Sequence, residues 1–295
     1  MSDSAGLRKP SWLRIGLPSG GNWRRVAAIL EKRGLATVCD QARCPNKAEC
    51  WGAATATFMV LGSICTRGCR FCAVTHAAQG ESLRPEEPRE LALAIGELGL
   101  AYAVITSVDR DDLPDRGASH FAACARAVKA LDPPVRIELL IPDYREGEIE
   151  LVLDAGPDVL AHNLETVERL QSLRDVRASY AASLKTLSLA AGRSQASGGS
   201  PVVKSSLMLG LGEEPGEVLR AMDDLRGAGC TSLVLGHYLR PTPRQAPVAR
   251  YLDEGEFAGY AHEARARGFA AVVSSPLART SYHARSSFDD SAARP

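Results

Sequence analysis

Residues 56–72 read ATFMVLGSICTRGCRFC, a largely apolar run that is followed at once by a loop with three cysteines. The run Ala56–Leu61 has the length and composition of a strand buried in a core. Reactive side chains that directly follow a buried parallel strand lie at the edge of the sheet where loops converge. This stretch therefore predicts an α/β fold with a chemical site at the carboxyl end of its first strand.

Short apolar runs alternate with longer helical patterns through the rest of the chain. The runs expected to form strands are Ala56–Leu61, Ala103–Thr106, Val135–Ile141, Val159–Ala161, Val202–Met208 and Leu233–Gly236. The helical candidates are Pro88–Leu98, His120–Leu131, Glu146–Ala155, Thr166–Leu173, Tyr180–Ala190 and Pro215–Ala228. Such alternation predicts a parallel sheet with right-handed crossovers. Six units favour a partial (β/α)6 barrel of the TIM type over an open doubly wound sheet.

The two ends of the chain do not follow this alternation. We expect an N-terminal extension (1–50), the barrel (51–275) and a C-terminal tail (276–295), with both extensions over the open face of the barrel. The segment 191–199, rich in Ser and Gly, is expected to form a mobile surface loop.

Charge and hydropathy exclude several classes of protein. The 35 basic residues balance the 35 acidic ones, which argues against a dedicated nucleic-acid or membrane-surface protein. No apolar run approaches the roughly 20 residues that cross a bilayer, and the first residues lack the apolar segment of a secretory signal. We therefore expect a cytoplasmic protein.

Six of the eight cysteines form two triplets, Cys39, Cys44 and Cys50, then Cys65, Cys69 and Cys72. The remaining two, Cys124 and Cys230, lie in patterns typical of a core. Disulfides would need an oxidising compartment, and zinc prefers four ligands in matched pairs. Two groups of three thiolates favour two iron–sulfur clusters, each with one iron left for another ligand or for substrate.

The second triplet has the spacing C-x3-C-x2-C with Phe71 just before Cys72, and it resembles the signature of radical S-adenosylmethionine enzymes. The resemblance implies that Cys65, Cys69 and Cys72 hold a [4Fe–4S] cluster whose open iron is chelated by S-adenosylmethionine. An electron from the cluster then generates a 5′-deoxyadenosyl radical. The cofactors supply this chemistry, and the protein orients the groups and excludes water.

Four further segments resemble the lipoyl synthase family. They are TVCDQARCPN (37–46), VITSVDRDDL (104–113), HNLETV (162–167) and RTSYHA (279–284), the last similar to the closing R-S-S-Y-H-A of that family. The resemblance runs from about Lys9 to Ala284. It implies insertion of two sulfur atoms at C6 and C8 of an octanoyl chain that is amide-linked to a lysine of a lipoyl carrier domain.

In this family a second, auxiliary [4Fe–4S] cluster is the sulfur source, which the resemblance assigns to Cys39, Cys44 and Cys50. Its fourth ligand is the second serine of the closing motif, which is Ser281 here. An oxygen ligand suits the soft cluster less well than a thiolate does, so that iron is easier to release. The motif has Thr280 in place of the first serine, and a second Arg-Ser-Ser copy follows, which leaves Ser287 as an alternative ligand.

For S-adenosylmethionine the resemblance favours Phe71 against the adenine and Thr106 with Ser107 near the amino group. Asn163 and Glu165 are expected toward the ribose and methionine ends. Arg177 is a candidate for the carboxylate, because a guanidinium can bind both oxygens. No catalytic residue is expected beyond the two clusters, and neither His162 nor His237 is assigned an acid or base role.

The partners that the resemblance implies are octanoylated carrier domains, which are the E2 subunits of 2-oxoacid dehydrogenases or the H protein of glycine cleavage. An electron donor such as flavodoxin or ferredoxin and an iron–sulfur carrier that repairs the cluster are also expected, with no nucleic acid and no membrane. Three alternatives remain: a related sulfur-inserting enzyme with another acyl or small-molecule substrate, an electron-transfer iron–sulfur protein, and a zinc-binding module.

Overall fold

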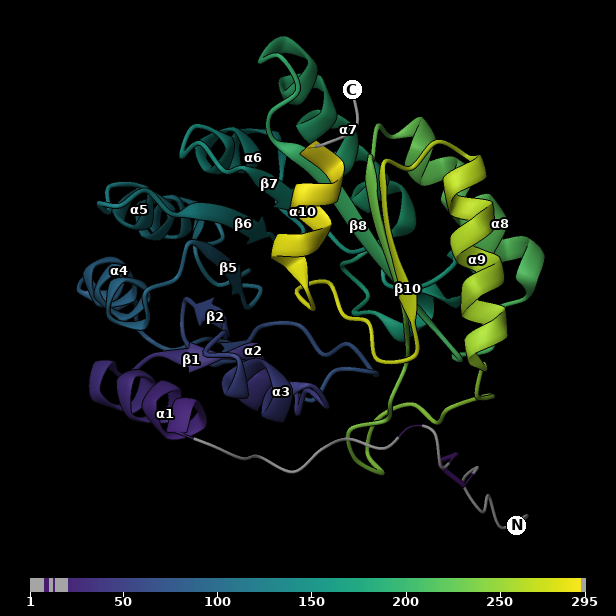
Figure 1. Ribbon diagram of the computed structural model, residues 1–295, viewed down its shortest axis with the longest axis horizontal. Coiled ribbons are helices and arrows are strands. Elements are labelled where there is room, and N and C mark those ends of the chain that lie inside the picture. The colour runs from purple at the N-terminus through teal and green to yellow at the C-terminus, as the bar shows by residue number, and fades with distance from the viewer. Residues whose placement is uncertain (1–7, 11–12, 14–20, 293–295) are drawn as a thin grey trace.

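A computed structural model describes residues 8–10, 13 and 21–292 of the chain. Figure 1 shows a curved sheet with helices along its outer side. The strands are β1 (Ala36–Thr37), β2 (Thr57–Val60), β3 (Ile64–Cys65), β4 (Thr75–His76), β5 (Tyr102–Ser107), β6 (Arg136–Leu140), β7 (Val159–Ala161), β8 (Val202–Leu209), β9 (Ser232–His237) and β10 (Ala271–Ser275).

The helices include one short 3₁₀ segment, η1. They are α1 (Gly21–Arg33), α2 (Val38–Gln41), α3 (Lys47–Gly52), α4 (Glu87–Leu98), α5 (Ala118–Lys129), α6 (Glu146–Leu153), η1 (Glu168–Leu173), α7 (Tyr180–Ala196), α8 (Pro215–Gly227), α9 (Glu254–Ala266) and α10 (Ala284–Ala292). Among the described helices none is long and apolar enough to cross a membrane.

The main sheet has the order β1-β2-β5-β6-β7-β8-β9-β10, and every pair is parallel except β1 with β2. Each of the six expected strands is present, so the prediction of a parallel α/β barrel is confirmed. The antiparallel pairing of Ala36–Thr37 attaches the N-terminal extension to the β2 edge. The sheet does not close on itself, which makes the barrel partial.

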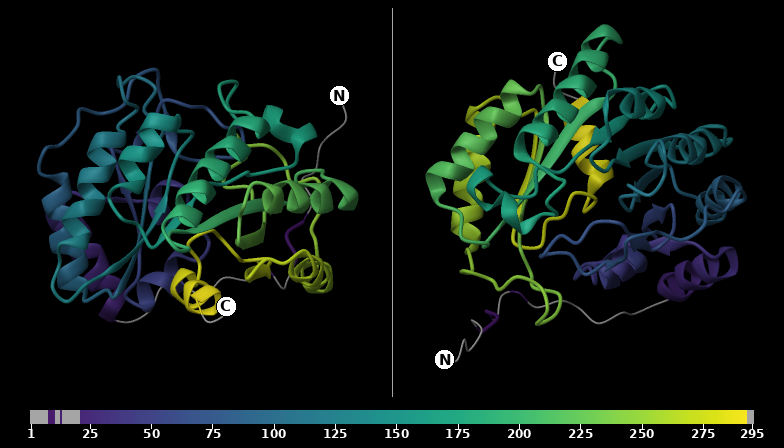
Figure 2. Two further views of the ribbon diagram at one scale, coloured as in Figure 1. Left: turned by 90° about the horizontal axis from the view of Figure 1, so that it is seen from above. Right: turned by 180° about the vertical axis from the view of Figure 1, so that it is seen from behind.

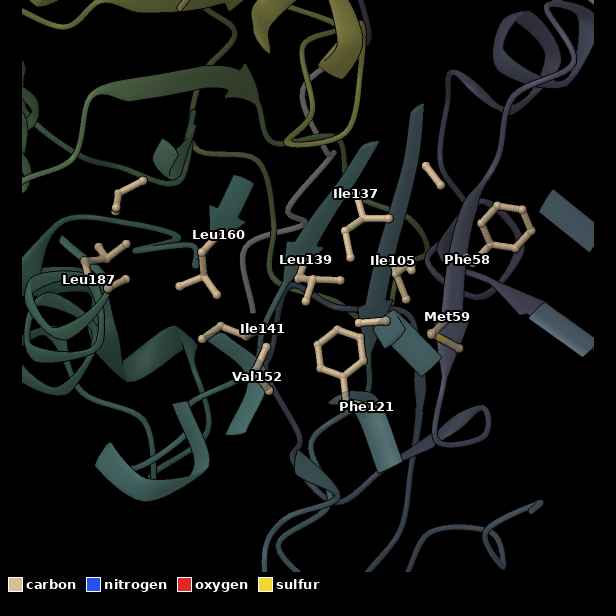
Figure 3. Close-up of a cluster of buried hydrophobic side chains, with 14 of the residues drawn as sticks. Phe58, Met59, Ile105, Phe121, Ile137, Leu139, Ile141, Val152, Leu160 and Leu187 are labelled. Atoms are coloured by element: carbon tan, nitrogen blue, oxygen red, sulfur yellow. The ribbon is translucent and has the colours of Figure 1, made fainter. Parts of the chain in front are cut away.

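The core lies between the sheet and the outer helices. Figure 3 shows Ile105, Ile137 and Leu139 from neighbouring strands beside Phe121 of α5, and all four are fully buried. Alternate residues of the same strands face the inside of the barrel, as the buried Glu138 of β6 and Lys204 of β8 do. Burial of each large apolar side chain contributes about 1.5–3 kcal/mol. The outer face of the sheet thus provides stability, and the inner face is free for polar groups.

Four local expectations need correction. The expected loop 191–199 is helical as far as Ala196, because the Ala-rich residues around Gly192 favour helix strongly enough to continue it. The helix expected from Thr166 is only the 3₁₀ segment η1, which follows Glu165 in a left-handed conformation (φ 69°). The strand β10 and the helix α9 were not predicted, since α9 contains two glycines and lacks a clear apolar stripe. Cys124 and Cys230 are buried in the core as expected.

The C-terminal segment 276–283 crosses the open side of the barrel. The hydrogen bonds that fix it include those from Asn46 Nδ2 to Leu277 O (2.7 Å), from Thr280 Oγ1 to Asn163 Oδ1 (3.0 Å) and from Thr57 Oγ1 to Ser281 Oγ (2.8 Å). The helix α10 that follows lies at the amino ends of the strands, where Phe288 contacts Tyr102 and Arg136 (Figure 2). We call residues 276–283 the closing segment.

Candidate active site

The cysteine loop after β2 is shaped by the residues around Leu61. Leu61 has a positive φ (70°), its N–H donates to Glu87 Oε2 (3.0 Å), and its carbonyl accepts from Arg110 Nη1 (3.0 Å). Glu87 also binds His120 Nε2 at 2.8 Å. These buried contacts turn the chain sharply at the carboxyl end of the strand. The turn sends Cys65, Cys69 and Cys72 over the mouth of the barrel.

A cavity of about 220 Å³ lies at this mouth, and all three cysteines of the second triplet line it. The other lining residues include Phe71, Thr106, Ser107, Asn163 and Glu165, together with Val38 and Ala42 at the two ends of helix α2, which carries Cys39. Five of the six side chains expected near S-adenosylmethionine are therefore brought together. The helix that carries Cys39 therefore also lines this cavity.

The sixth, Arg177, does not line this cavity. Its guanidinium binds Asp175 (Nε to Oδ1, 2.7 Å) and Thr66 O (2.6 Å), on the outer side of the cysteine loop. Arg174 lines the cavity instead, held by two hydrogen bonds to Asp143 at 2.9 and 3.1 Å. Both arginines lie near one another in the sequence, and only the path of the chain after η1 decides which of them faces inward.

A buried charge network forms one wall of the cavity. Burial alone would raise the pKa of Asp143, but the hydrogen bond from His162 and the guanidinium groups of Arg174 and Arg67 hold that pKa well below its usual range. Burial raises the pKa of Asp109 to about 6, and the Cys65 thiol donates to this carboxylate at 3.9 Å. The sequence placed Asp109, Asp143 and His162 at strand ends but did not indicate this network.

The two histidines are structural. His162 contacts Ile141 O (3.1 Å), Ser183 Oγ (2.9 Å) and Asp143, and His237 contacts the carbonyls of Tyr238 and Arg250 at 2.6 and 3.1 Å. Every ring nitrogen of this pair is engaged by protein groups. That neither acts as a general acid or base stays a prediction.

The thiols of both triplets are desolvated. Burial raises the pKa of Cys65 and Cys69 to about 12 and that of Cys72 to about 11. Burial likewise raises the pKa of Cys50 to about 12, with nearby Cys39 and Cys44 adding to the shift. Thiolates in such surroundings require a cationic centre, because an isolated negative charge is costly to bury. The donor chemistry therefore fits a metal centre at each triplet.

Neither cysteine triplet brings its three sulfurs within 4.8 Å of one another, as three ligands of one ion would lie. Within the described residues, one group of three His, Cys, Asp or Glu side chains has all its ligand atoms within 4.8 Å, namely Glu87, His120 and Cys124. In an iron–sulfur cluster each thiolate binds a different iron, so a wider spacing is what a [4Fe–4S] centre needs.

Two polar atoms without partners support this fit. Among the described residues, the buried Ser107 Oγ and Trp51 Nε1 have no hydrogen-bond partner. Ser107 lines the cavity where the amino group of S-adenosylmethionine is expected, and the Trp51 indole lies beside Cys39, a thiol whose pKa is raised by burial. A buried donor or acceptor left unpaired costs about 1–3 kcal/mol, which a bound ligand would recover.

The sequence profile of the radical SAM superfamily matches residues 59–225. Two solved structures share the fold. Methylornithine synthase (PylB) has a TM-score of 0.56 and 15% sequence identity, over 87% of this chain and 72% of that chain. The FeFe-hydrogenase maturase HydG from Carboxydothermus hydrogenoformans has a TM-score of 0.58 and 15% sequence identity, over 79% of this chain and 56% of that chain. The fold and the cysteine loop define a radical S-adenosylmethionine enzyme, a class that uses a [4Fe–4S] cluster.

Curated relatives define the family more closely. The chain is 50% identical over 281 residues to the lipoyl synthase of Methanocella arvoryzae, covering 94% of this chain and 93% of that protein. It is 51% identical over 284 residues to the lipoyl synthase of Methylococcus capsulatus, covering 95% and 86%. The chain belongs to the lipoyl synthase family, and its function is that of a lipoyl synthase.

Proposed function

We propose that this enzyme inserts two sulfur atoms at C6 and C8 of an octanoyl chain amide-linked to a lysine of a carrier domain. The observation that carries the proposal is the shared cavity, which has the second triplet on one wall and the helix α2 of the first triplet on another. An acyl chain in this space would lie between the source of the radical and the source of the sulfur.

The residues present fit two clusters. Cys65, Cys69 and Cys72 would hold the one that binds S-adenosylmethionine, and Cys39, Cys44 and Cys50 with Ser281 would hold the auxiliary one. When bound, these groups supply a 5′-deoxyadenosyl radical that removes hydrogen atoms from unactivated carbons, and the sulfur that replaces them. No general acid or base of the protein is required.

The side chains of the cavity would bind and orient S-adenosylmethionine. Phe71 offers an aromatic face for the adenine, and the unpartnered Ser107 Oγ a contact for the amino group. The Thr106 hydroxyl donates to Leu140 O (2.9 Å), so toward the ligand it can only accept. Asn163 Nδ2 donates to Glu165 Oε1 (3.1 Å), which fixes both groups for the ribose and methionine ends.

For the carboxylate of S-adenosylmethionine we assign Arg174 in place of Arg177. Arg174 lines the cavity and has its guanidinium already oriented by Asp143. The role of Arg177 is to hold the cysteine loop through Thr66 O, while its partner Asp175 accepts from Gly68 N (2.9 Å). Both arginines thus serve the site, one from inside the cavity and one from outside.

Several parts of the proposal rest on the family resemblance alone. They are the division into residues 1–50, 51–275 and 276–295, the E2 subunits or H protein as carriers, a flavodoxin or ferredoxin as reductant, an iron–sulfur carrier for repair, and a cytoplasmic location. The alternative ligand Ser287 lies in α10, and its side chain is outside the described residues.

The direct test is anaerobic reconstitution followed by reaction with S-adenosylmethionine, a strong reductant and an octanoyl-lysine peptide, with mass analysis of the peptide and of 5′-deoxyadenosine. We expect dithiolated peptide. Formation of 5′-deoxyadenosine with an unchanged peptide would support the radical chemistry but refute the assignment of the octanoyl substrate. The protein would then be a related enzyme that acts on another compound.

A further inference from the structure

A second cavity, of about 400 Å³, lies at the amino ends of β2 and β5, away from the mouth that holds the cysteine loop. Its lining includes Cys50 and Ser281, two of the assigned ligands of the auxiliary cluster, with Thr57 and Tyr102 at the strand starts. No cysteine of the second triplet lines it. The auxiliary site therefore borders two separate spaces.

The closing segment separates these two spaces. Thr280 binds Asn163 of the first cavity and Ser206 of β8 (2.9 Å), whereas the next residue, Ser281, lines the second cavity. Substrate and S-adenosylmethionine would fill the first cavity during the reaction. The second cavity then remains as the approach to the auxiliary cluster from the other side, and it opens next to both Ser281, the oxygen ligand, and Cys50.

A pair of exposed contacts holds the closing segment at the rim of the second cavity. Tyr282 Oη donates to Glu49 Oε1 (2.9 Å), and His283 Nε2 lies 3.6 Å from the same oxygen. Glu49 directly precedes the ligand Cys50, and Tyr282 directly follows Ser281. The Glu49 and His283 side chains are 56% and 58% exposed. We call Glu49, Tyr282 and His283 the rim latch.

The backbone at the same rim is strained. His283 and Ala54, which both line the second cavity, have positive φ angles of 51° and 56°. A left-handed alanine is uncommon and persists only where its surroundings enforce it. Release of the rim latch would thus allow the closing segment to relax and Ser281 to move.

We propose that the second cavity is the port through which iron and sulfide leave and re-enter the auxiliary site, and that the rim latch is its gate. This inference rests on the proposed function, since a cluster that gives up sulfur must be rebuilt after each reaction. The port lies on the face opposite the substrate, so the protein separates repair from catalysis.

The test measures iron release to a ferrous chelator from anaerobically reconstituted protein, with the cluster content followed by Mössbauer spectroscopy. Glu49→Ala removes the acceptor of the rim latch, and we expect auxiliary iron to leave about 2- to 5-fold faster, the scale of one exposed hydrogen bond. Glu49→Gln keeps an acceptor for Tyr282 and should release iron at nearly the native rate. The cluster at Cys65, Cys69 and Cys72 should release iron at an unchanged rate in both variants.

A second variant narrows the port instead of opening it. Ala101 lines the second cavity and is exposed, so Ala101→Trp should slow auxiliary iron release, whereas Trp at the exposed Ala130, outside the cavity, should not. Unchanged rates in both Glu49→Ala and Ala101→Trp, or equal changes at both clusters, would overturn the proposal.

A third arm tests the direction from which substrate arrives. Octanoyl-lysine peptide added without S-adenosylmethionine should leave auxiliary iron release unchanged. If the peptide completely prevented iron release from the auxiliary site, the second cavity would be the substrate entrance. That result would overturn the proposal that the cavity is a port for iron and sulfide. Iron release does not depend on turnover, so failure to convert the peptide would refute the proposed function without affecting this result.

Discussion

The two cysteine triplets are built in different ways. The second lies on one continuous loop, and backbone N–H groups close to it support its sulfurs, from Arg67 to Cys65 (3.4 Å) and from Asp175 to Cys69 (3.3 Å). The first spans two short helices and depends on the closing segment, more than 200 residues further along the chain, for Ser281 and for the bond from Asn46. A local site and a long-range site thus share one cavity.

This difference has a functional meaning. A cluster that stays intact through the reaction benefits from a rigid local loop, whereas a cluster that is consumed needs ligands that can be released and replaced. In the proposed auxiliary site, the closing segment would supply the oxygen ligand Ser281 from a part of the chain that a few hydrogen bonds hold. The comparison therefore predicts that disturbances of the closing segment affect the auxiliary site alone.

The largest effect is expected for Cys69→Ala. Without this thiolate the loop cannot hold its cluster, so formation of 5′-deoxyadenosine and of product should both lose the roughly 10⁶-fold or greater acceleration that enzymes supply. The auxiliary cluster should remain, which iron analysis would detect as retention of about half the iron. Loss of all iron would show that the two sites do not form independently.

Ser281→Ala should affect the auxiliary site and leave the site of the second triplet intact, the opposite of the Cys69→Ala result. We expect the 5′-deoxyadenosine signal to persist while dithiolated product falls by more than the roughly 10- to 100-fold that loss of a ligand's supporting partner costs. Ser281→Cys should give a more stable auxiliary cluster that yields less product. Ser287→Ala is the matched control. If only that variant lost product, Ser287 in the second copy of the motif, and not Ser281, would be the ligand.

Lys204→Ala should lower the free energy of unfolding of the whole barrel and so affect both cysteine sites equally. Lys204 Nζ binds Glu138 at 2.9 and 3.0 Å inside the barrel, and the two side chains are 2% and 1% exposed. Loss of the cation leaves a buried carboxylate unpaired, at a cost of about 3–5 kcal/mol in the free energy of unfolding. Denaturant midpoints of the apoprotein would measure this, and the double change Glu138→Leu with Lys204→Met should recover part of it.

A smaller effect is expected for Asn46→Ala. Asn46 is 3% exposed, and its amide donates to Leu277 O at 2.7 Å. Its loss leaves a partly buried carbonyl unpaired, which costs about 1 kcal/mol and loosens the closing segment. Auxiliary iron should become more accessible to a chelator while the other cluster is unchanged. Asn22→Ala, which removes an exposed bond to Gly52 O (2.9 Å), is the control that should change neither.

Sequence alone predicted most of the barrel, because strand and helix formation follow from local hydrophobic periodicity. It also identified both triplets, since the spacing of cysteines within a few residues limits which centre they can bind. It missed β10 and α9, where the apolar pattern is weak, and it ended α7 too early, at Ala190 instead of Ala196.

Tertiary structure decided what lies far apart in the chain. The choice of Arg174 over Arg177 depends on the turn after η1, and the pairing of Glu138 with Lys204 depends on the order of three strands. The second cavity and the rim latch exist only because the closing segment returns to β2 and α3. Local propensity fixes elements within a few residues, whereas these contacts depend on how the elements are packed, which no short stretch of sequence contains.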